Sequence, residues 1–386
     1  MTRENRIVGR RNVLKSLGVG SVAALAGCMA PSSELQQSSG GGGGGPDPVA
    51  DDTDNPLTDH PYTAPPEIVN LADQGYESTL RTVPSRHALL TDDAAGGPIE
   101  LPEVWAWQAD DHDPSVPGPI YRIEEGETFE LHYENTEDNR PHTVHMHAVD
   151  KSWQDDGAPV ATGDYVGADE SQTYEYEANV PGTHVYHCHY QTHNHLDMGM
   201  YGILRVDPED YEPPDREYFL TFREWDSRLH HQNAGGNTSY DPMNRSPHYF
   251  TMNGRAAPTT FHPEQGSPII VSEGDTVNIH LVNGGYDSHT IHLHGHRFTV
   301  TEKDGSPISE EAQHEEDVRS IAAAERYTIE FEADSDPGIY PLHCHKVHHV
   351  TNDGSYPGGM ATAIVYEEIM DTEEFQAVMD MAGFDG

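Results

Sequence analysis

Apolar and polar residues alternate with a period of two through much of the chain beyond residue 66. Residues 123–131 and 174–178 are clear examples, and such runs are bounded by Gly, Pro and Asn. This alternation is typical of antiparallel β-strands that bury one face. The pattern therefore predicts an all-β fold.

These segments occur twice. Residues 123–131 match residues 271–279, and residues 174–178 match residues 327–331. The repeat indicates that the chain consists of two similar β-sandwiches or barrels.

A chain of 386 residues is long enough for two domains with full cores. We place the first domain at 66–213 and the second at 214–370, with the junction near the Pro-Pro pair at 213–214. The acidic tail at 371–386 is expected to form a short helix.

A metal-binding pattern lies inside the repeat and also occurs twice. In each copy His-x-x-His-x-His is followed about forty residues later by Pro-Gly and then His-Cys-His. The first copy contains His142, His145, His147, His187, Cys188 and His189, and the second contains His289, His292, His294, His343, Cys344 and His345. Thiolate and imidazole at matched positions select a transition metal and favour copper or zinc. If the protein is exported, Cys188 and Cys344 would ordinarily suggest a disulfide, but the histidines on both sides of each cysteine argue against one.

Strand geometry divides each copy into two faces, because successive side chains of a strand point to opposite sides. In the first copy one face offers Cys188 and His142. The opposite face offers four imidazoles, those of His145, His147, His187 and His189. The second copy repeats this with Cys344 and His289 on one face and His292, His294, His343 and His345 on the other. We therefore predict two different metal sites in each domain.

The composition of the chain indicates an acidic surface. The formal charge is −45, from 66 acidic and 21 basic side chains. Tyr, Val and Ile are spread evenly through the acidic sequence, which predicts a folded acidic shell rather than a disordered chain. Such a surface repels nucleic acid. It is typical of proteins of extreme halophiles, because roughly 1 M salt reduces the screening length to about 3 Å.

The first 28 residues resemble an export signal. Arg10 and Arg11 belong to a twin-arginine-like motif, and an apolar run ends at a lipobox-like Leu-Ala-Gly-Cys at 25–28. We expect export by the twin-arginine route and lipid attachment through Cys28 to the outer face of the cell membrane, with an uncleaved anchor as the alternative. Residues 29–65, rich in Gly, Ser and acidic residues, are expected to form a flexible linker.

The paired His-x-His and His-Cys-His motifs resemble those of multicopper oxidases, and their place in two β domains resembles the two-domain, laccase-like branch. The match covers about 100–368, including Met252 to Arg255 and His292 to Phe298. The resemblance implies that each domain is a cupredoxin Greek-key barrel and that copper is the cofactor. It implies that the eight paired histidines hold a trinuclear type 2/type 3 cluster, with type 1 copper at each cysteine. It also implies a homotrimer in which the cluster forms between neighbouring subunits; a cluster between the two domains of one chain is the alternative.

A type 1 copper takes two histidines, a thiolate and usually a weak axial Met. In the first domain His142 and Cys188 can be completed by His195 with Met200 or by His193 with Met198. We favour His195 and Met200, because Gly199-Met200 leads directly into an apolar strand pattern.

In the second domain the corresponding set is His289, Cys344 and Met360, completed by His349 or His348. We favour His349, which follows Cys344 by five residues, a spacing that the resemblance supports. The segment between His349 and Met360 is longer than the family pattern.

The resemblance implies an enzyme that takes single electrons from a phenolic, aromatic amine or metal-ion donor and reduces O₂ to water. Asp156 resembles the acidic residue that delivers protons in laccases, and an ordinary solvated Asp is the competing interpretation.

One rival function is that of a copper nitrite reductase; in that family an acid stands at the position of His145, and no imidazole follows the type 1 cysteine. A non-catalytic copper-binding or electron-transfer protein would leave the paired histidines unexplained. Zinc does not seek a mixed site with a nearby Met.

Overall fold

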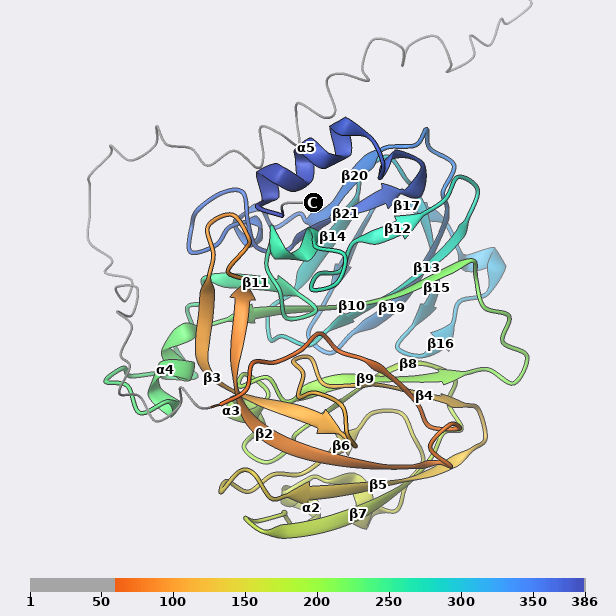
Figure 1. Cartoon of the computed structure of the whole chain (residues 1–386). Helices are drawn as coiled ribbons and strands as arrows, with labels where there is room; N and C mark the ends of the chain where they lie inside the picture. Colours follow the sequence, from red (N-terminus) through yellow and green to blue (C-terminus); the bar gives the residue numbers. More distant parts are fainter. Residues whose placement is uncertain (1–59, 385–386) are drawn as a thin grey trace, which may run out of the picture.

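The computed structural model describes residues 60–384, so the predicted leader at 1–28 and all but the end of the predicted linker at 29–65 lie outside the described residues. The described strands form four sheets (Figure 1). Strands β1 to β9 form two of these sheets, which we call the N-terminal half, and β10 to β21 form the other two, the C-terminal half. The prediction of an all-β fold is confirmed.

One sheet of the N-terminal half has four strands and the other has five. The four-stranded sheet has the order β3 (Ile99–Ala109), β2 (Glu77–Leu90), β5 (Thr128–Asn135) and β7 (Glu170–Glu177). The five-stranded sheet has the order β1 (Ile68–Asn70), β4 (Ile120–Glu124), β9 (Tyr201–Asp207), β8 (Gly182–His187) and β6 (His145–Met146).

The C-terminal half repeats this plan. Its larger sheet has the order β11 (Tyr249–Met252), β10 (Arg216–Trp225), β13 (Thr276–Asn283), β19 (Arg326–Glu332), β15 (Phe298–Lys303) and β16 (Ser306–Pro307), with β17 (Glu315–Glu316) also on β15. Its second sheet has the order β12 (Ile269–Val271), β21 (Ala361–Tyr366), β20 (Ile339–Cys344), β14 (His289–Leu293) and β18 (Val318–Ile321). The chain passes between the halves at 208–215, and the domain boundary at 213/214 stays a prediction.

Short helices occupy the connections and the C-terminal tail. They are η4 (Trp153–Asp156), α2 (Pro159–Thr162), α3 (Thr192–His195), α4 (Ser227–Asn233), η5 (Thr259–Phe261), η6 (Glu310–Ala312), η7 (Val347–Val350), η8 (Glu367–Ile369) and α5 (Glu373–Ala382). Among residues 60–384, no helix is long and apolar enough to cross a membrane.

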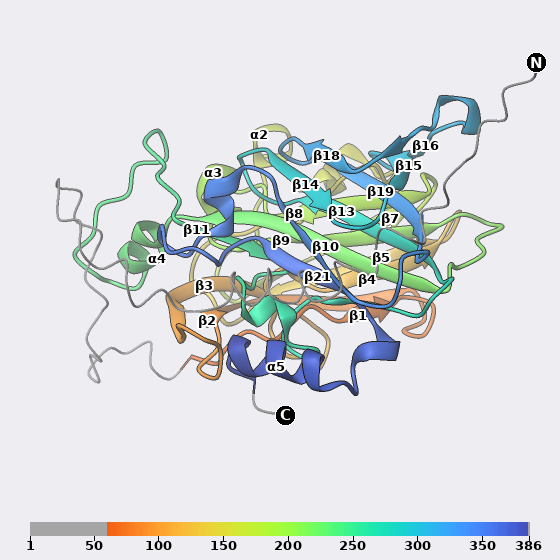
Figure 2. The same ribbon diagram turned by 90° about the horizontal axis from the view of Figure 1, so that it is seen from above.

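The helix expected in the acidic tail is α5. The side chain of Thr372 caps its N-terminus by accepting a hydrogen bond from the amide of Phe375. The carbonyl of Ala382 at its other end accepts a hydrogen bond from the amide of Ala95. Figure 2 shows α5 beside β2 and β3, so the tail joins the C-terminal half to the N-terminal half.

The sheets are mixed rather than purely antiparallel as the alternation predicted. Strand β2 pairs in parallel with β5, and β10 pairs in parallel with β13. In each case the chain visits the opposite sheet, at β4 or β12, before it returns to form the partner strand. A period of two reports which face is buried, but it carries no information about strand direction.

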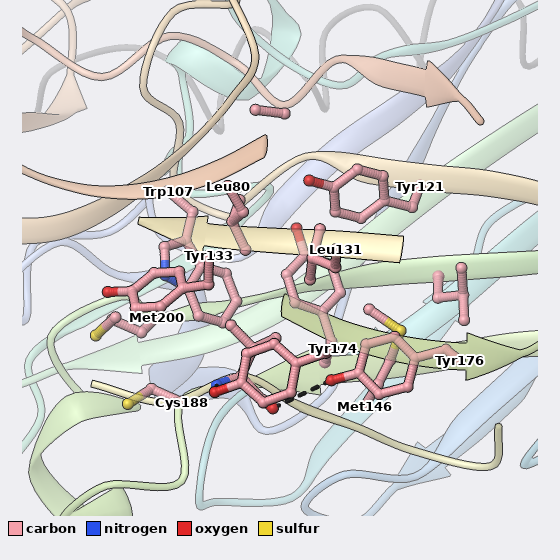
Figure 3. Packing of buried hydrophobic residues seen from close by; sticks show 14 of the residues in the cluster. Leu80, Trp107, Tyr121, Leu131, Tyr133, Met146, Tyr174, Tyr176, Cys188 and Met200 are labelled. Atoms are coloured by element: carbon pink, nitrogen blue, oxygen red, sulfur yellow. Dashed lines mark hydrogen bonds between the residues drawn. The ribbon is translucent and has the colours of Figure 1, made fainter. Parts of the chain in front are cut away.

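The core of the N-terminal half is rich in buried aromatic side chains. Figure 3 shows Tyr121, Tyr133, Tyr174 and Tyr176 packed with Leu80 and Leu131. A buried tyrosine needs a partner for its hydroxyl. Tyr176 donates to the carbonyl of Val144 at 3.2 Å, and the hydroxyl of Tyr174 accepts from the amide of Val144 at 3.3 Å. These two phenols therefore hold the backbone between His142 and His145.

The two halves pack through β8 and β9 on one side and β10, β13 and β19 on the other (Figure 1). The apolar part of this contact contains Ile120, Val185, Ile203, Phe219 and Val282. Beside it the buried guanidinium of Arg205 lies 3.0 Å from the carboxylate of Glu302. The buried charge is paired, as its desolvation requires.

Candidate metal centres

The structure brings Cys188 together with His142 and His195. The sulfur of Cys188 lies 3.4 Å from Nδ1 of His195 and 3.9 Å from Nδ1 of His142, and the two Nδ1 atoms are 3.1 Å apart. All three side chains are buried. One thiol and two imidazole nitrogens therefore converge inside the protein.

The C-terminal half repeats this arrangement with Cys344, His289 and His349. The sulfur of Cys344 lies 3.4 Å from Nδ1 of His349, which is 3.2 Å from Nδ1 of His289. The three side chains are buried here too. We call the two groups the Cys188 site and the Cys344 site.

The alternative histidines lie outside these sites. His193 and His348 are exposed, whereas His195 and His349 are buried against the thiols. His348 packs edge-on against His349 with their ring centroids 4.4 Å apart.

The backbone places one methionine in the same way at each site. The amide of Cys188 donates to the carbonyl of Met200, and the amide of Met200 donates to the carbonyl of His195. In the second half Cys344, Met360 and His349 make the same two bonds. Met200 and Met360 are therefore equivalent despite the longer segment before Met360. Figure 3 shows Cys188 and Met200 at the same end of the core.

Met198 occupies a different environment. Its side chain is also buried, but its sulfur accepts a hydrogen bond from the amide group of Asn233 at 3.4 Å. This contact occupies the Met198 sulfur, and Met200 remains the methionine that matches Met360.

The paired histidines of the N-terminal half gather on the opposite face. The rings of His145, His147, His187 and His189 have neighbouring centroids 5.1 to 5.8 Å apart. Strand pairing places His145 opposite His187, and Nε2 of His147 is 3.1 Å from Nε2 of His187. We call these four residues the N-terminal histidine set.

The C-terminal histidine set consists of His292, His294, His343 and His345. Neighbouring ring centroids are 4.8 to 5.9 Å apart. Strand pairing places His292 opposite His343, and Nε2 of His294 is 3.0 Å from Nε2 of His343. His294 and His345 are exposed. The two sets therefore share register and geometry.

Carbonyl oxygens determine which nitrogen of several histidines is free to bind metal. Nδ1 of His187 donates to the carbonyl of Cys188 at 2.9 Å, and Nδ1 of His343 donates to the carbonyl of Cys344 at 3.0 Å. A carbonyl can only accept, so Nδ1 carries the hydrogen and Nε2 keeps its lone pair. His145 and His292 are held in the same way by the carbonyls of Asp156 and Asp317.

Burial keeps several of the imidazoles neutral. Desolvation lowers the pKa of His147 to about 2 and that of His187 to about 4. The same cause lowers the pKa of His195 and of His349 to about 3. Burial also raises the pKa of the Cys188 thiol to about 12, so metal binding at this site must release the thiol proton.

The donor sets fit copper. The nitrogen and sulfur atoms converge without disulfide formation, because both cysteines are free. Nδ1 of His189 is buried without a hydrogen-bond partner, as are Nε2 of His142 and of His349, the ring nitrogens that do not face the thiols. Thiolate with two imidazoles and a nearby methionine is a set that copper prefers over zinc.

Asp156 lies beside the N-terminal histidine set. Its carboxylate is 3.4 Å from Nδ1 of His145 and 3.4 Å from Nζ of Lys151. The turn after it requires Gly157, because a Cβ there would lie 1.9 Å from the carbonyl oxygen of Val144. The structure therefore places the predicted proton donor next to the histidines, and its role stays a prediction.

Three acidic residues near the sites escaped the sequence reasoning. Asp138 lies 3.6 Å from Nε2 of His142, Glu224 lies 2.9 Å from Nε2 of His289, and Asp317 holds His292 through its carbonyl. Burial lowers the pKa of His289, but hydrogen bonds to Cys344 and Glu224 outweigh this effect and raise the pKa to about 8. Of these three residues, only Asp138 lies close in sequence to its histidine, because it precedes His142 by four residues. Glu224 and Asp317 are distant in sequence from the histidines they contact.

The comparisons with known proteins agree with this geometry. Family models described as multicopper oxidase match residues 107–211 and 233–361, one in each half. The blue copper oxidase of Nitrosomonas europaea has 28% identity and a TM-score of 0.65, over 80% of this chain and 88% of that chain. The chain belongs to the multicopper oxidase family. It is therefore an oxidoreductase that uses copper, and the cupredoxin-like fold is confirmed.

Sequence relatives of this multicopper oxidase include nitrite reductases and a laccase. The copper-containing nitrite reductase of Neisseria meningitidis is 25% identical over 78% of this chain and 74% of its own length. Laccase-2 of Botryotinia fuckeliana is 25% identical over 58% of this chain and 40% of its own. A probable nitrite reductase-hydroxylamine oxidoreductase fusion protein of Kuenenia stuttgartiensis is 26% identical over 65% of this chain, which spans only 28% of that protein.

The lowered histidine pKa values predict how this multicopper oxidase behaves without copper. Below an ordinary pKa of 6.5, unfolded His147 binds a proton that folded His147 lacks until the pH reaches about 2. The free energy of unfolding therefore falls as the pH falls through 6.5. We expect the copper-free variant His147→Gln to lose less stability between pH 7 and pH 4.5 than the unchanged protein, measured by urea unfolding.

The exposed His314 provides the control, and His314→Gln should follow the unchanged protein. Parallel pH profiles for His147→Gln and the unchanged protein would contradict this prediction.

Proposed function

We propose that this protein is a laccase-like oxidase that takes single electrons from a phenolic, aromatic amine or metal-ion donor and reduces O₂ to water. The observation that carries the proposal is the position of each cysteine between two histidines that face the other way. Copper bound at these residues would supply the one-electron chemistry. The Cys188 and Cys344 sites would receive electrons, and the two histidine sets would hold the metal that meets O₂.

The chain itself joins the two kinds of site. His187 and His189 are bonded directly to Cys188, and the carbonyl of Cys188 accepts the hydrogen bond from Nδ1 of His187. A covalent path and a hydrogen-bonded path thus run from the thiol to the histidine set. His343, Cys344 and His345 provide the same connection in the second half.

Both halves hold a complete type 1 ligand set in this proposal. The sets are His142, Cys188, His195 and Met200 in the first half and His289, Cys344, His349 and Met360 in the second. The shared backbone bonds around Met200 and Met360 support their equivalence.

We propose further that the trinuclear cluster forms between the subunits of a homotrimer. Among residues 60–384, no hydrogen bond, ion pair or ring contact joins a histidine of the N-terminal set to one of the C-terminal set. His294 and His345 are exposed in the single chain. Each set would be completed by the opposite half of another copy.

The proposed place of action is outside the cell membrane. The twin-arginine-like motif and Cys28 of the leader support export and a lipid anchor. The charge of −45 supports function in very high salt.

Nitrite reduction is the second candidate, and the name of the Neisseria relative favours it. In the nitrite reductase family an acid stands at the position of His145, and no histidine follows the type 1 cysteine. Here His145 is an imidazole of the N-terminal set, and His189 and His345 follow the cysteines. These three residues favour the oxidase.

Removing His189 separates the two candidates. We expect His189→Ala to abolish O₂ uptake with a phenolic donor while the blue thiolate absorption remains, because the imidazole and the thiol face opposite sides. His314→Ala, at an exposed histidine, is the control. If His189→Ala keeps O₂ uptake, or if the unchanged copper-loaded protein reduces nitrite but not O₂, the oxidase assignment is wrong.

Mixing two inactive variants tests the position of the cluster. One variant carries His147→Ala and the other carries His294→Ala, so each has one intact histidine set. When the two chains are unfolded and refolded together, we expect O₂ uptake to recover partly, because an intact set of one subunit can meet an intact set of another. Oxygen uptake and sedimentation measure the outcome, and the variants refolded separately are the controls. Co-assembly into trimers without recovery would place the cluster within one chain.

The carboxylate of Asp156 is expected to deliver protons to the N-terminal histidine set. Asp156→Asn should lower kcat on the order of 10²-fold, because proton transfer by a positioned group contributes at least that much. Copper content should stay normal. Asp155→Asn is the matched control, because Asp155 bonds to Ser152 instead. Unchanged turnover in Asp156→Asn would show that this carboxylate is an ordinary solvated group.

A further inference from the structure

The two cysteine sites share their ligands but differ in the carboxylates behind them. Such outer partners alter the basicity of a metal-bound imidazole and so the properties of the metal. The duplication makes the comparison direct, because each site serves as the reference for the other.

At the Cys344 site a fully buried carboxylate contacts a histidine directly. Glu224, on β10, is 1% exposed and accepts a hydrogen bond from Nε2 of His289 at 2.9 Å. Its other oxygen accepts from the amides of Tyr286 and Asp287 at 2.6 and 3.2 Å. The neighbouring Arg223 directs its guanidinium away to Asp197 and to a backbone carbonyl. No cation is hydrogen-bonded to the Glu224 carboxylate among the described residues.

At the Cys188 site the corresponding carboxylate is farther away and is bonded to a guanidinium. Asp138 lies 3.6 Å from Nε2 of His142, which has no hydrogen-bond partner. Both oxygens of Asp138 instead accept from the guanidinium of Arg140 at 3.1 and 3.0 Å. Arg140 therefore gives Asp138 a cationic partner, which it shares with the buried carboxylate of Glu103 at 2.8 Å.

The second histidine of each site, His349 or His195, does not reverse this difference in the nearby carboxylates. At the Cys344 site Asp287 lies 3.6 Å from Nε2 of His349 and pairs with Lys346 at 2.7 Å. At the Cys188 site the described ion pairs include no carboxylate at His195. Among residues 60–384, Glu224 is thus the one carboxylate that bonds to a ligand histidine and has no cation hydrogen-bonded to it.

We propose that Glu224 is a positioning residue that orients His289 and makes the Cys344 site the copper centre of lower reduction potential. A carboxylate bonded to the N–H of a ligand imidazole makes that ligand more basic and favours Cu(II) over Cu(I). The Cys188 site, without such a carboxylate, is the stronger oxidant and is reduced first. It is therefore the site that accepts one electron from the more weakly reducing donors. This inference rests on the proposed function, because it requires type 1 copper in both halves.

Single-site variants test the order of the potentials. Cys188→Ser leaves only the Cys344 site, and Cys344→Ser leaves only the Cys188 site. The visible thiolate absorption of each copper-loaded variant is followed during a redox titration. We expect the potential of the Cys344 site to be lower by at least a tenfold difference in the reduction equilibrium constant, about 59 mV for one electron. Equal potentials or the opposite order would overturn the inference.

The same titration identifies the cause. Glu224→Gln, added to Cys188→Ser, keeps an oxygen acceptor for the amide of Tyr286 but removes the charge. We expect it to raise the potential and to weaken copper binding about 10-fold. Asp138→Asn, added to Cys344→Ser, is the matched control and should raise the potential less. A shift in Glu224→Gln no larger than in Asp138→Asn would also overturn the inference.

Arg140→Gln keeps the test decisive if the buried Glu224 variant does not fold. The side chain of Arg140 is 31% exposed, and its removal leaves the Asp138 charge without its partner. In the Cys344→Ser background we expect the potential of the Cys188 site to fall toward that of the Cys344 site. An unchanged or higher potential would contradict the argument from charge. The absence of a blue absorption in Cys188→Ser would instead refute the proposed type 1 site in the second half.

Discussion

The alternation of side chains at His-Cys-His is the constraint on which both kinds of site depend. Where β8 and β20 end, the cysteine points into the core with the methionine of its half, and its neighbours point to the other face. Neither site can move without the other, because one peptide separates their ligands. A shift of register by one residue would exchange the faces and destroy both sites.

The protein presents opposite histidine nitrogens on the two faces. Backbone carbonyls hold Nδ1–H of His145, His187, His292 and His343, which leaves their Nε2 atoms available. At the thiols the histidines present Nδ1 instead. Burial keeps several of these rings neutral but leaves polar atoms without partners, and such atoms are costly in a folded protein. Copper that binds the folded chain and not the unfolded one would add stability, so function and stability require the same ligand.

Sequence reasoning succeeded where the chemistry is local and failed where it depends on tertiary contacts. Period-two alternation predicted the strands, and parity predicted which histidines accompany Cys188 and Cys344, although His142 lies outside β6 and is paired only with Val166. Strand direction could not be predicted, because β2 and β5 meet only after the chain has crossed to the other sheet. Glu224 could not be found either, since it lies 65 residues from His289 and reaches it through the packing of β10.

The two halves agree more closely in the backbone that positions the metal ligands than in the charged residues around these ligands. Backbone bonds among Cys, Met and His are the same in both halves, because they determine where the donor atoms meet. The carboxylates come from different places: Asp138 from the loop just before His142, and Glu224 from a strand of the other sheet. Residues that only tune a site can be supplied from any direction, because charge acts over several ångströms. Two copies of one ligand set can therefore diverge in potential while both keep the geometry that holds copper.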